Sequence, residues 1–599
     1  MPRTLNYVAK HVIFPINAKW VFPRRAGGIN QRIINRKSYR GFFNHPCSFE
    51  DSRHGLQLSM RRLWTSIRWQ SYARRVSTHS PTMTRTYEAA ISSLNSLQTN
   101  YAIVEALKKS KTRQELNDLS LPETVDWLQR IGYKPSDLNR LNAIHVAGTK
   151  GKGSTSAFIS TILSQYSRKD ADQSESNLKI GLYTSPHLRF ARERIKIDNA
   201  PLSEEQFARY FFEVWDRLEQ AAKMAGQDPT EPGAKPQYFR YLTLMAFHTY
   251  LSEGVDAAVI ECGIGGQYDC TNVIPQPKVT AISSLGIDHV AMLGHTIEEI
   301  AWHKGGILKR GINGFAAPQP PSAEQVLAKR AEEAGAHLEI VAGHSELCPE
   351  SSKITLGLAG DFQYTNASVA VAAAADLLRQ VDIDVPENIM QGPLPAKFKT
   401  GLEETRLGGR CETRFEKNVS WYIDGGHTLE SIRLAGQWFA SRIQADSSSE
   451  DVAAKKTRIL IFNQQTRDST ALARALHETL ASALGNDTPF THALFCTNIT
   501  YKEAGFRPDL VSMNTNADDL EHLRVQKSLA VEWNAIDPHA QTHIFGTIEE
   551  AVDFAREIAG QERKVLQKDE TPVMTFVTGS IHLVGGFLDV VETKPPTDV

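Results

Sequence analysis

The sequence predicts an α/β protein in which a larger nucleotide-binding domain is followed by a smaller Rossmann-like domain. From about residue 86 onwards, strand-like apolar runs alternate with stretches of helical spacing, which is typical of a mostly parallel sheet covered by helices. A stretch rich in glycine and lysine joins a strand to a helix at residues 145–156, and a stretch rich in proline and glycine at residues 387–401 precedes a second series of strands. We therefore expect a leader over residues 1–83, an ATP-binding P-loop domain over 84–392 and a Rossmann-like domain over 393–599.

Length and composition set the class of protein. A chain of 599 residues suits two or three domains, and 41% hydrophobic with 23% charged residues is ordinary for a globular protein, which excludes a fibrous or wholly disordered chain. The sequence lacks an apolar run of about 18 residues, so we predict no membrane span. The six cysteines contain no C-x-x-C pair, which favours reduced thiols and argues against a zinc site.

The amino-terminal segment differs in composition from the rest of the chain. Residues 1–87 carry 16 lysines and arginines against Glu50 and Asp51, whereas the remainder holds 66 acidic and 51 basic residues. An arginine-rich leader with interspersed apolar residues and almost no acidic ones is typical of a mitochondrial transit peptide. The alternative is a disordered basic arm that binds nucleic acid. A start at Met83 would give a second, cytosolic product.

The stretch "HVAGTKGKGSTS" is the strongest local signal. Backbone N–H groups at a helix N-terminus, together with a lysine ammonium, bind phosphate well. Compared with the standard G-x-x-x-x-G-K-[ST] loop, Val146 replaces the first glycine and Gly153 replaces the hydroxyl residue, with Ser154 one place later. A glycine-rich turn without ligand is the alternative, but the strand "LNAIHVAG" before the loop and the helix "STSAFISTILSQY" after it favour ATP or GTP.

The regular elements follow from the periodicity of apolar residues. In the first domain we expect strands at 178–185, 256–263 and 278–286, and helices at 86–98, 121–132 and 239–254. In the second we expect strands at 419–427, 458–463, 492–498 and 573–580. The polar stretches at 168–177 and 226–237 are predicted to be surface loops.

Three polar clusters follow predicted strands of the first domain, at the sheet edge where ligands bind. Ser185 follows the first strand, although a Ser-Pro turn is the commoner explanation for it. Glu261 ends an apolar strand, where an unpaired carboxylate is costly, so a Mg²⁺ ion shared with nucleotide phosphates would suit it. Asp288 and His289 follow a third strand and add a candidate ligand. Lys304, on a helix fifteen residues later, would by itself be an exposed surface lysine.

The second domain contributes charged residues after its own strands. Asp424 and His427 follow one strand, and Arg410 precedes it. Asn463, Arg467 and Asp468 follow the next strand. Arginines and carboxylates that face a phosphate loop suggest a nucleotide clamped between the two domains, with arginine neutralising charge on the transferring phosphoryl group.

Together these motifs resemble the folylpolyglutamate synthase family of the Mur ligase superfamily, in its eukaryotic, fungal type. The matching segments run in family order from about residue 86 to 588: TYEAAISSLNSLQTN, DWLQRIGY, HVAGTKGKGS, GLYTSPHL, ECGIGGQYDCTN, SLGIDHVAMLGHTIEEIAWHKGGI, YIDGGHT and VTGSIHLVGG. The resemblance implies a Mur-ligase-like ATPase domain followed by a glutamate-ligase domain. It further implies ATP-dependent addition of L-glutamate to the γ-carboxylate of a folate's terminal glutamate, through an acyl phosphate.

The resemblance also assigns residues and ligands. It implies ATP and two Mg²⁺ ions, with room for a monovalent cation. The phosphate loop would comprise Thr149, Lys150, Gly151, Lys152, Gly153 and Ser154, with Ser154 also near the first Mg²⁺. Further nucleotide contacts would be Asn366, Arg410 and Asp424, the Mg²⁺ ligands Ser185, Glu261 and His289, and the catalytic residues Lys152, Lys304 and His427. Lys304 matches a lysine that is carbamylated in related ligases.

The resemblance implies tetrahydrofolate, its polyglutamates and L-glutamate as partners, with no nucleic acid. It also implies a monomer, with peripheral association with the mitochondrial inner membrane as an option. Two rival functions stay open: dihydrofolate synthase, which performs the same chemistry on dihydropteroate either alone or in a bifunctional enzyme, and a non-catalytic nucleotide- or RNA-binding protein.

Overall fold

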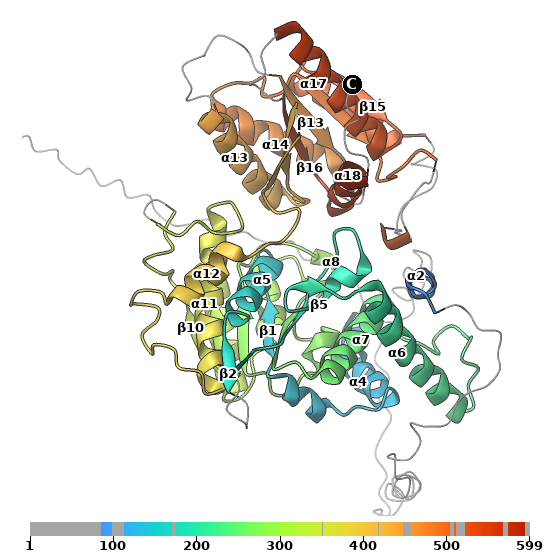
Figure 1. The fold of residues 1–599 in the computed structure, drawn as a ribbon, viewed down its shortest axis with the longest axis vertical. Coiled ribbons are helices and arrows are strands. Elements are labelled where there is room, and N and C mark those ends of the chain that lie inside the picture. The colour runs from blue at the N-terminus through green and yellow to red at the C-terminus, as the bar shows by residue number, and fades with distance from the viewer. Residues whose placement is uncertain are drawn as a thin grey trace, which may run out of the picture. The chain divides into compact units, whose positions relative to one another are not determined.

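The computed structural model (Figure 1) describes residues 85–98, 113–169, 175–349, 352–416, 418–446, 457–465, 467–503, 508–510, 522–566 and 573–593. All of them belong to one unit, Pro81–Val599. The predicted leader over 1–83, with Met83, lies outside the described residues, so the transit-peptide and nucleic-acid interpretations stay predictions.

The first sheet has eight strands in the order β10-β9-β8-β1-β7-β4-β5-β6. Its strands are β1 (Ile144–Ala147), β4 (Ile180–Tyr183), β5 (Ile195–Ile197), β6 (Ala200–Pro201), β7 (Ala257–Glu261), β8 (Val279–Ile282), β9 (Asn313–Ala316) and β10 (His337–Ile340). The six strands from β10 to β4 are parallel, whereas β5 and β6 run antiparallel. The carboxyl ends of β1, β4, β7 and β8 therefore lie at one edge.

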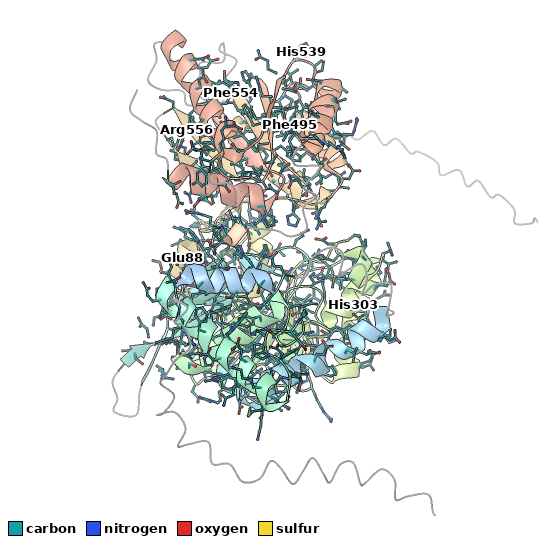
Figure 2. The ribbon with its side chains drawn as sticks, turned by 90° about the vertical axis from the view of Figure 1, so that its right-hand side faces the viewer. Glu88, His303, Phe495, His539, Phe554 and Arg556 are labelled. Carbon is teal, nitrogen blue, oxygen red and sulfur yellow. The ribbon has the colours of Figure 1, made fainter. Side chains whose placement is uncertain are left out.

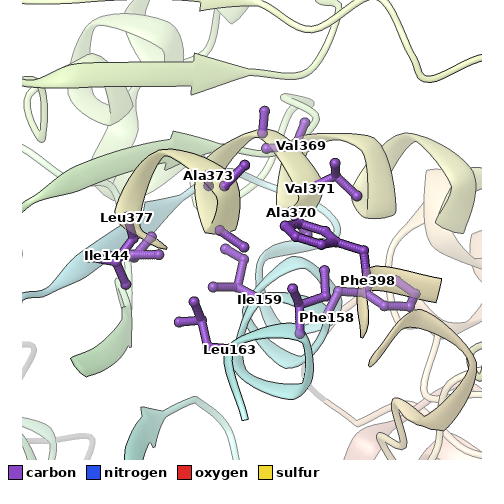
Figure 3. Packing of buried hydrophobic residues seen from close by; sticks show 14 of the residues in the cluster. Ile144, Phe158, Ile159, Leu163, Val369, Ala370, Val371, Ala373, Leu377 and Phe398 are labelled. Atoms are coloured by element: carbon purple, nitrogen blue, oxygen red, sulfur yellow. The ribbon is translucent and has the colours of Figure 1, made fainter. Parts of the chain in front are cut away.

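Helices cover both faces of this sheet. One face carries α5 (Lys152–Leu163), α11 (Phe362–Gln380) and α12 (Ala396–Glu404), and the other carries α2 (Tyr87–Ser96), η2 (Pro135–Leu141), α6 (Glu204–Met224) and α7 (Tyr238–Glu253). Figure 3 shows α5 packed against α11. The small side chains of Ala370 and Ala373 on α11 let this helix approach Phe158 and Ile159 of α5 closely. This packing holds the start of α5 at the sheet edge.

The remaining elements of this part of the chain are short or peripheral. They are α4 (Arg113–Arg130), η3 (Ala191–Arg194), η4 (Cys270–Val273), α8 (Val290–Leu293), α9 (Ile297–Gly305), α10 (Pro321–Ala334) and the hairpin β2 (Ser167–Lys169) with β3 (Glu175–Asn177). The hairpin lies where we predicted a loop, because the polar sequence gave no period-2 pattern.

The second sheet has six strands in the order β11-β12-β16-β13-β14-β15. They are β11 (Glu412–Phe415), β12 (Val419–Ile423), β13 (Arg458–Phe462), β14 (His492–Cys496), β15 (Gln541–Phe545) and β16 (Val573–Thr578). One face packs on α13 (Leu429–Asp446), α14 (Ser469–Leu484) and α16 (Arg524–Ile536), and the other on α17 (Ile548–Leu566) and α18 (Ile581–Thr593). Phe495, labelled in Figure 2, is buried in the core on one face, and Phe554, also labelled, is partly buried and packs against the core on the other.

All the predicted strands form, and besides the hairpin the sequence analysis missed β5, β6, β9, β10, β11 and β15. The predicted boundary at residue 393 falls just before α12, whose Phe398 and Leu402 pack in the core of the first sheet. Among the described residues, no helix combines the length and apolar character needed to cross a membrane.

Candidate active site

The loop between β1 and α5 has a backbone that only glycine can follow. Gly148 and Gly151 have φ of 146° and 87°, and a methyl group at Gly148 would lie 1.9 Å from Ser283 Oγ. The N–H groups of Thr149 and Lys150 both donate to the Ser284 carbonyl at 3.0 Å. These two predicted loop residues therefore shape the loop with their amides. The amides at the start of α5 have no carbonyl one turn earlier and remain suited to an anion.

Three lysines converge on this loop. Lys152 Nζ donates to Thr149 O at 3.5 Å, and Lys304 Nζ donates to Gly148 O at 2.7 Å. Lys150 Nζ forms an ion pair with Asp288 at 3.0 Å. A bound polyanion would be neutralised here more effectively than by any single cation.

Lys304 corrects the expectation of an exposed surface lysine. Its side chain is buried, because α9 begins at a capping box of Thr296 and Glu299 and directs its last turn under the loop. Burial, helped by the nearby Lys152 ammonium, lowers the pKa of Lys304 to about 7. A substantial fraction of its amine is therefore neutral at physiological pH.

Helix α11 packs against the loop at Gly151. A methyl group at Gly151 would lie 2.1 Å from Asn366 Oδ1, so Asn366 contacts the loop directly. Its amide donates to Gln363 Oε1 at 2.9 Å, and Gln363 in turn donates to Ser154 Oγ at 3.3 Å. The predicted contact Asn366 and the predicted ligand Ser154 thus belong to one buried network.

Glu261 and Ser185 meet at the ends of β7 and β4. The Ser185 N–H donates to Glu261 Oε2 at 3.0 Å, and this is the one hydrogen bond that the described residues give the carboxylate. Burial raises the pKa of Glu261, while Lys152, the Ser185 N–H and Arg410 act in the opposite direction. A buried carboxylate with a single donor is a strong candidate for contact with a cation.

Asp288 and His289 lie at the same edge. His289 has φ of 51° at the start of α8, and its N–H donates to Asp288 Oδ1 at 2.8 Å. Burial lowers the pKa of His289; Asp288 opposes this effect, and Lys152 and Lys304 reinforce it. His289 therefore lies within electrostatic reach of both lysines at the loop and stays neutral enough to act as a ligand.

Across from the loop, the second domain presents Arg410 and Asp424. Asp424 is buried and accepts bonds from the N–H groups of Cys411 and Gly426, at 2.9 and 2.8 Å. Burial raises its pKa, and Arg410 partly opposes that effect. Because Arg410 also acts on Glu261, it lies within electrostatic reach of both buried carboxylates.

The other predicted residues of the second domain differ in their surroundings. His427 Nδ1 donates to Gly425 O at 2.9 Å, and its pKa is lowered to about 4, first by burial and further by Lys150 and Arg467. Asp468 instead caps α14 by accepting the Ala471 N–H.

Ion pairing and close packing join the two α/β domains beside the loop. Arg467 Nη2 lies 3.0 Å from Asp288 Oδ1. A methyl group at Gly286 would lie 2.5 Å from Glu430 Oε2, so α13 begins against the loop that follows β8. The charged residues of the second domain therefore face the P-loop edge.

Among the described residues, no group of three or more His, Cys, Asp or Glu could hold a metal by itself. Ser185, Glu261 and His289 offer one carboxylate, one hydroxyl and one imidazole. This is a partial ligand set, of the kind that binds Mg²⁺ together with nucleotide phosphates.

Comparison with known proteins decides the family. No family model matches the chain. A folylpolyglutamate synthase of Neurospora crassa is 44% identical over 509 residues, which cover 85% of this chain and 92% of that protein. The enzyme of the same name from Saccharomyces cerevisiae strain FostersO is 43% identical over 514 residues, with 85% and 87% coverage. The chain belongs to the folylpolyglutamate synthase family.

Solved folylpolyglutamate synthases share the fold at lower identity. The Mycobacterium tuberculosis protein complexed with ADP and AMPPCP is 21% identical with a TM-score of 0.55, and covers 80% of this chain and 100% of its own. An FPGS–AMPPCP–folate complex is 22% identical with a TM-score of 0.53, and covers 81% and 100%. The α/β architecture is thus the folylpolyglutamate synthase fold.

Sequence reasoning missed two contributors to this folylpolyglutamate synthase site. Gln363 lies one helical turn before Asn366, and only the i, i+3 spacing on α11 could have suggested that both face the loop. Glu430, at the start of α13, had no distinguishing signal because first-turn glutamates are common in helices.

Proposed function

We propose that this protein is an ATP-dependent ligase that adds L-glutamate to the γ-carboxylate of the terminal glutamate of a folate, producing folylpolyglutamates. Two relatives that are 44% and 43% identical to it over the aligned residues carry the name folylpolyglutamate synthase. Structures of the same fold have been solved with an ATP analogue, and one of those also with folate.

The proposal rests on one observation: cationic and acidic groups meet at the phosphate loop, at the sheet edge where β1, β4, β7 and β8 end. Lys152 and Lys304 contact the loop backbone, and Glu261 lies within electrostatic reach of Lys152. The second domain adds Arg410 and Arg467 from the opposite side. Such an arrangement binds a triphosphate and neutralises charge as it moves.

The chemistry explains why ATP is needed. A carboxylate is a poor electrophile until phosphorylation turns one of its oxygens into a leaving group. The acceptor's γ-carboxylate oxygen attacks the γ-phosphorus and ADP leaves, giving an acyl phosphate. The amine of L-glutamate then attacks the acyl carbon, the C–O bond breaks, and inorganic phosphate and a proton are released. Here the protein chiefly positions the reactants and stabilises the negative charge, with Lys152 on the phosphates.

Mg²⁺ fits the residues present. Glu261 is a buried carboxylate that receives only one hydrogen bond from the described residues, and Ser185 lies beside it. Ser185, Glu261 and His289 would hold the ion, and Ser154 is an additional candidate. When bound, Mg²⁺ would neutralise phosphate charge. A second Mg²⁺ and a monovalent cation belong to the same proposal.

Lys304 is proposed to carry a carbamate. A neutral amine is the form that adds CO₂, and the low pKa of Lys304 supplies it. The neutral amine attacks the carbon of CO₂, so a C–N bond forms on Nζ as one C–O π bond opens. One proton leaves the nitrogen, and the neutral side chain becomes an anionic carbamate. The new carboxylate would help to hold a divalent cation.

Cellular placement is part of the proposal as well. The basic, acid-poor composition of residues 1–83 supports import into the mitochondrion, and translation from Met83 would supply the cytosol. We expect a monomer in both compartments, with peripheral attachment to the inner membrane as an option in the first.

The decisive assay uses the full chain with ATP, Mg²⁺ and radiolabelled L-glutamate, and compares tetrahydrofolate with dihydropteroate as acceptor. Incorporation onto tetrahydrofolate alone, abolished in Lys152→Ala and kept in the surface variant Lys223→Gln, supports the proposal. Incorporation onto dihydropteroate would favour dihydrofolate synthase or a bifunctional enzyme. If folded protein incorporates no L-glutamate with either acceptor, the proposed ligase function is wrong.

A further inference from the structure

A cavity of about 300 Å³ lies next to the candidate active site, lined by residues of both α/β domains. The chain from Thr184 to Pro201 forms one side, and the segment from Leu407 to Arg414 with helix α18 forms the other. Thr184 and Pro186 flank Ser185, so the cavity adjoins the edge where Glu261 lies.

The lining of this cavity is rich in cations, and its two carboxylates are already occupied. Glu193 accepts the N–H groups of Leu188, Arg189 and Phe190 at 2.9 to 3.1 Å. Glu592 pairs with Arg414 at 2.7 Å and also with Arg189. The acidic side chains thus serve the wall of the cavity, and among the described residues neither forms an ion pair with the other cations of the lining, Lys196, Arg192 and Arg410.

Lys196 is the clearest example among these cations. It lies on β5 with its neighbours Ile195 and Ile197 directed to the other side of the strand. No described residue gives its ammonium a hydrogen bond or an ion pair. Burial lowers its pKa, and only the nearby charge of Glu193 opposes that effect. A half-buried ammonium of this kind gains from an anionic ligand.

Arg192 and Arg410 reinforce the same charge. Arg192 Nη1 donates to Leu202 O at 3.1 Å, but its buried Nε has no partner among the described residues. Within the same part of the chain, Arg410 donates only from Nη1 to Gly409 O, at 3.0 Å. Each guanidinium therefore keeps donors in the arrangement that matches a carboxylate.

We propose that this cavity binds carboxylates of the glutamyl substrates through Lys196, Arg192 and Arg410. The inference rests on the proposed function and adds to it where the glutamyl anions bind. A γ-linked glutamyl chain carries one α-carboxylate per residue and free L-glutamate carries two carboxylates, so the cation cluster matches either source. The apolar side chains of Leu188 and Leu588 in the same lining suit the methylene groups between carboxylates.

The test substitutes Lys196 and separates the two sources. We compare Lys196→Gln with the charge-preserving Lys196→Arg and with Lys223→Gln, whose side chain is 64% exposed on α6. Initial rates give the KM for tetrahydrofolate with one and with three glutamyl residues, for L-glutamate and for ATP. Calorimetry measures binding of γ-linked triglutamate, of L-glutamate and, separately, of ADP.

We expect Lys196→Gln to raise the KM of the triglutamyl acceptor or of L-glutamate about tenfold, the loss expected for one charge-assisted bond. Lys196→Arg and Lys223→Gln should stay within about twofold, as should the KM for ATP in all variants. A change in the acceptor KM assigns the cavity to the glutamyl chain, and a change in the glutamate KM assigns it to the incoming amino acid.

Unchanged KM values for both in folded Lys196→Gln would overturn the inference. The calorimetric measurements test this inference independently of the proposed function. A wild-type chain without ligase activity would refute that function. Binding of triglutamate or of L-glutamate that is lost in Lys196→Gln, with ADP binding retained, would still support the cavity assignment. Titrations that give equal affinities of both proteins for triglutamate and for L-glutamate would refute it.

Discussion

Asp288 bridges the phosphate loop and the second domain, because its two oxygens pair with Lys150 Nζ and Arg467 Nη2, each at 3.0 Å. Burial alone would raise the pKa of Asp288, but Lys150, His289 and Arg467 outweigh that effect and hold it well below the usual range. The carboxylate is thus charged throughout the physiological pH range. It pairs at the same time with Lys150 of the loop and with Arg467 of the second domain.

Asp288→Asn should leave Lys150 and Arg467 in place without their shared counter-charge. We expect kcat/KM for ATP to fall about ten- to a hundredfold, in line with loss of a buried, doubly paired carboxylate. Arg467→Gln removes one of the two pairs and should have the smaller effect. Equal rates in wild type and Asp288→Asn would contradict the bridging role.

The same carboxylate predicts a pH dependence of stability. Its pKa is lower in the folded than in the unfolded chain, so its stabilisation is complete above the unfolded value, about 4, and is lost as the pH falls towards the folded value. Calorimetric unfolding should show a constant difference between wild type and Asp288→Asn from pH 5 to 8, and a shrinking one below pH 4. A difference that grows on acidification is not compatible with this assignment.

Lys304 should respond to CO₂ if its neutral amine is carbamylated. Because burial and Lys152 lower its pKa to about 7, added bicarbonate at pH 8 and constant ionic strength should raise kcat of CO₂-depleted enzyme. Lys304→Ala should lose at least tenfold in kcat, show no bicarbonate effect and recover part of its rate with acetate. A bicarbonate response that survives in Lys304→Ala would place the modification elsewhere.

His427 offers its Nε2 as an acceptor, since its Nδ1 is committed to Gly425 O. His427→Asn keeps a donor near the Nδ1 position and removes Nε2, so we expect kcat to fall about 10²- to 10⁴-fold with little change in thermal stability at pH 8. The lowered pKa of about 4 means that the His427 contribution to stability is lost as the pH falls from 6.5 towards 4. His427→Asn should therefore be less acid-sensitive than wild type between those values, and a rate equal to wild type would exclude the acceptor role.

Tyr87 and Asp509 connect helix α2 to the short segment η5 (Pro508–Leu510) of the second domain. The Tyr87 hydroxyl donates to Asp509 Oδ1 at 2.5 Å, and the Ala191 N–H donates to the same oxygen at 2.7 Å. Tyr87→Phe leaves the half-buried carboxylate one donor short and should cost about 1–3 kcal/mol of unfolding free energy. Arg85→Gln, which breaks an exposed pair with Asp216, should cost under about 1 kcal/mol in the same denaturation measurement.

The sequence predicted the sheet-forming strands that precede functional residues, because their apolar runs are continuous and end at glycine or polar clusters. The sequence therefore predicts Ser185, Glu261 and His289 at one edge of the sheet. The short edge strands β10 and β15 were not predicted, because their alternating, half-exposed residues carry little apolar signal.

The burial of Lys304 could not be predicted in the same way. It depends on α9 directing its last turn under Gly148, a tertiary contact more than 150 residues apart in sequence. Nor could Lys196 be found, because an isolated lysine on a short strand is usually solvent-exposed.

The most direct test of the account is the mass of the product formed by the full chain from tetrahydrofolate monoglutamate, ATP, Mg²⁺ and L-glutamate. The account predicts folate species that increase by successive glutamyl residues, with one ADP and one phosphate released per addition, and no such products from Lys152→Ala. Folded enzyme that hydrolyses ATP or binds folate without forming a longer glutamyl chain would contradict it.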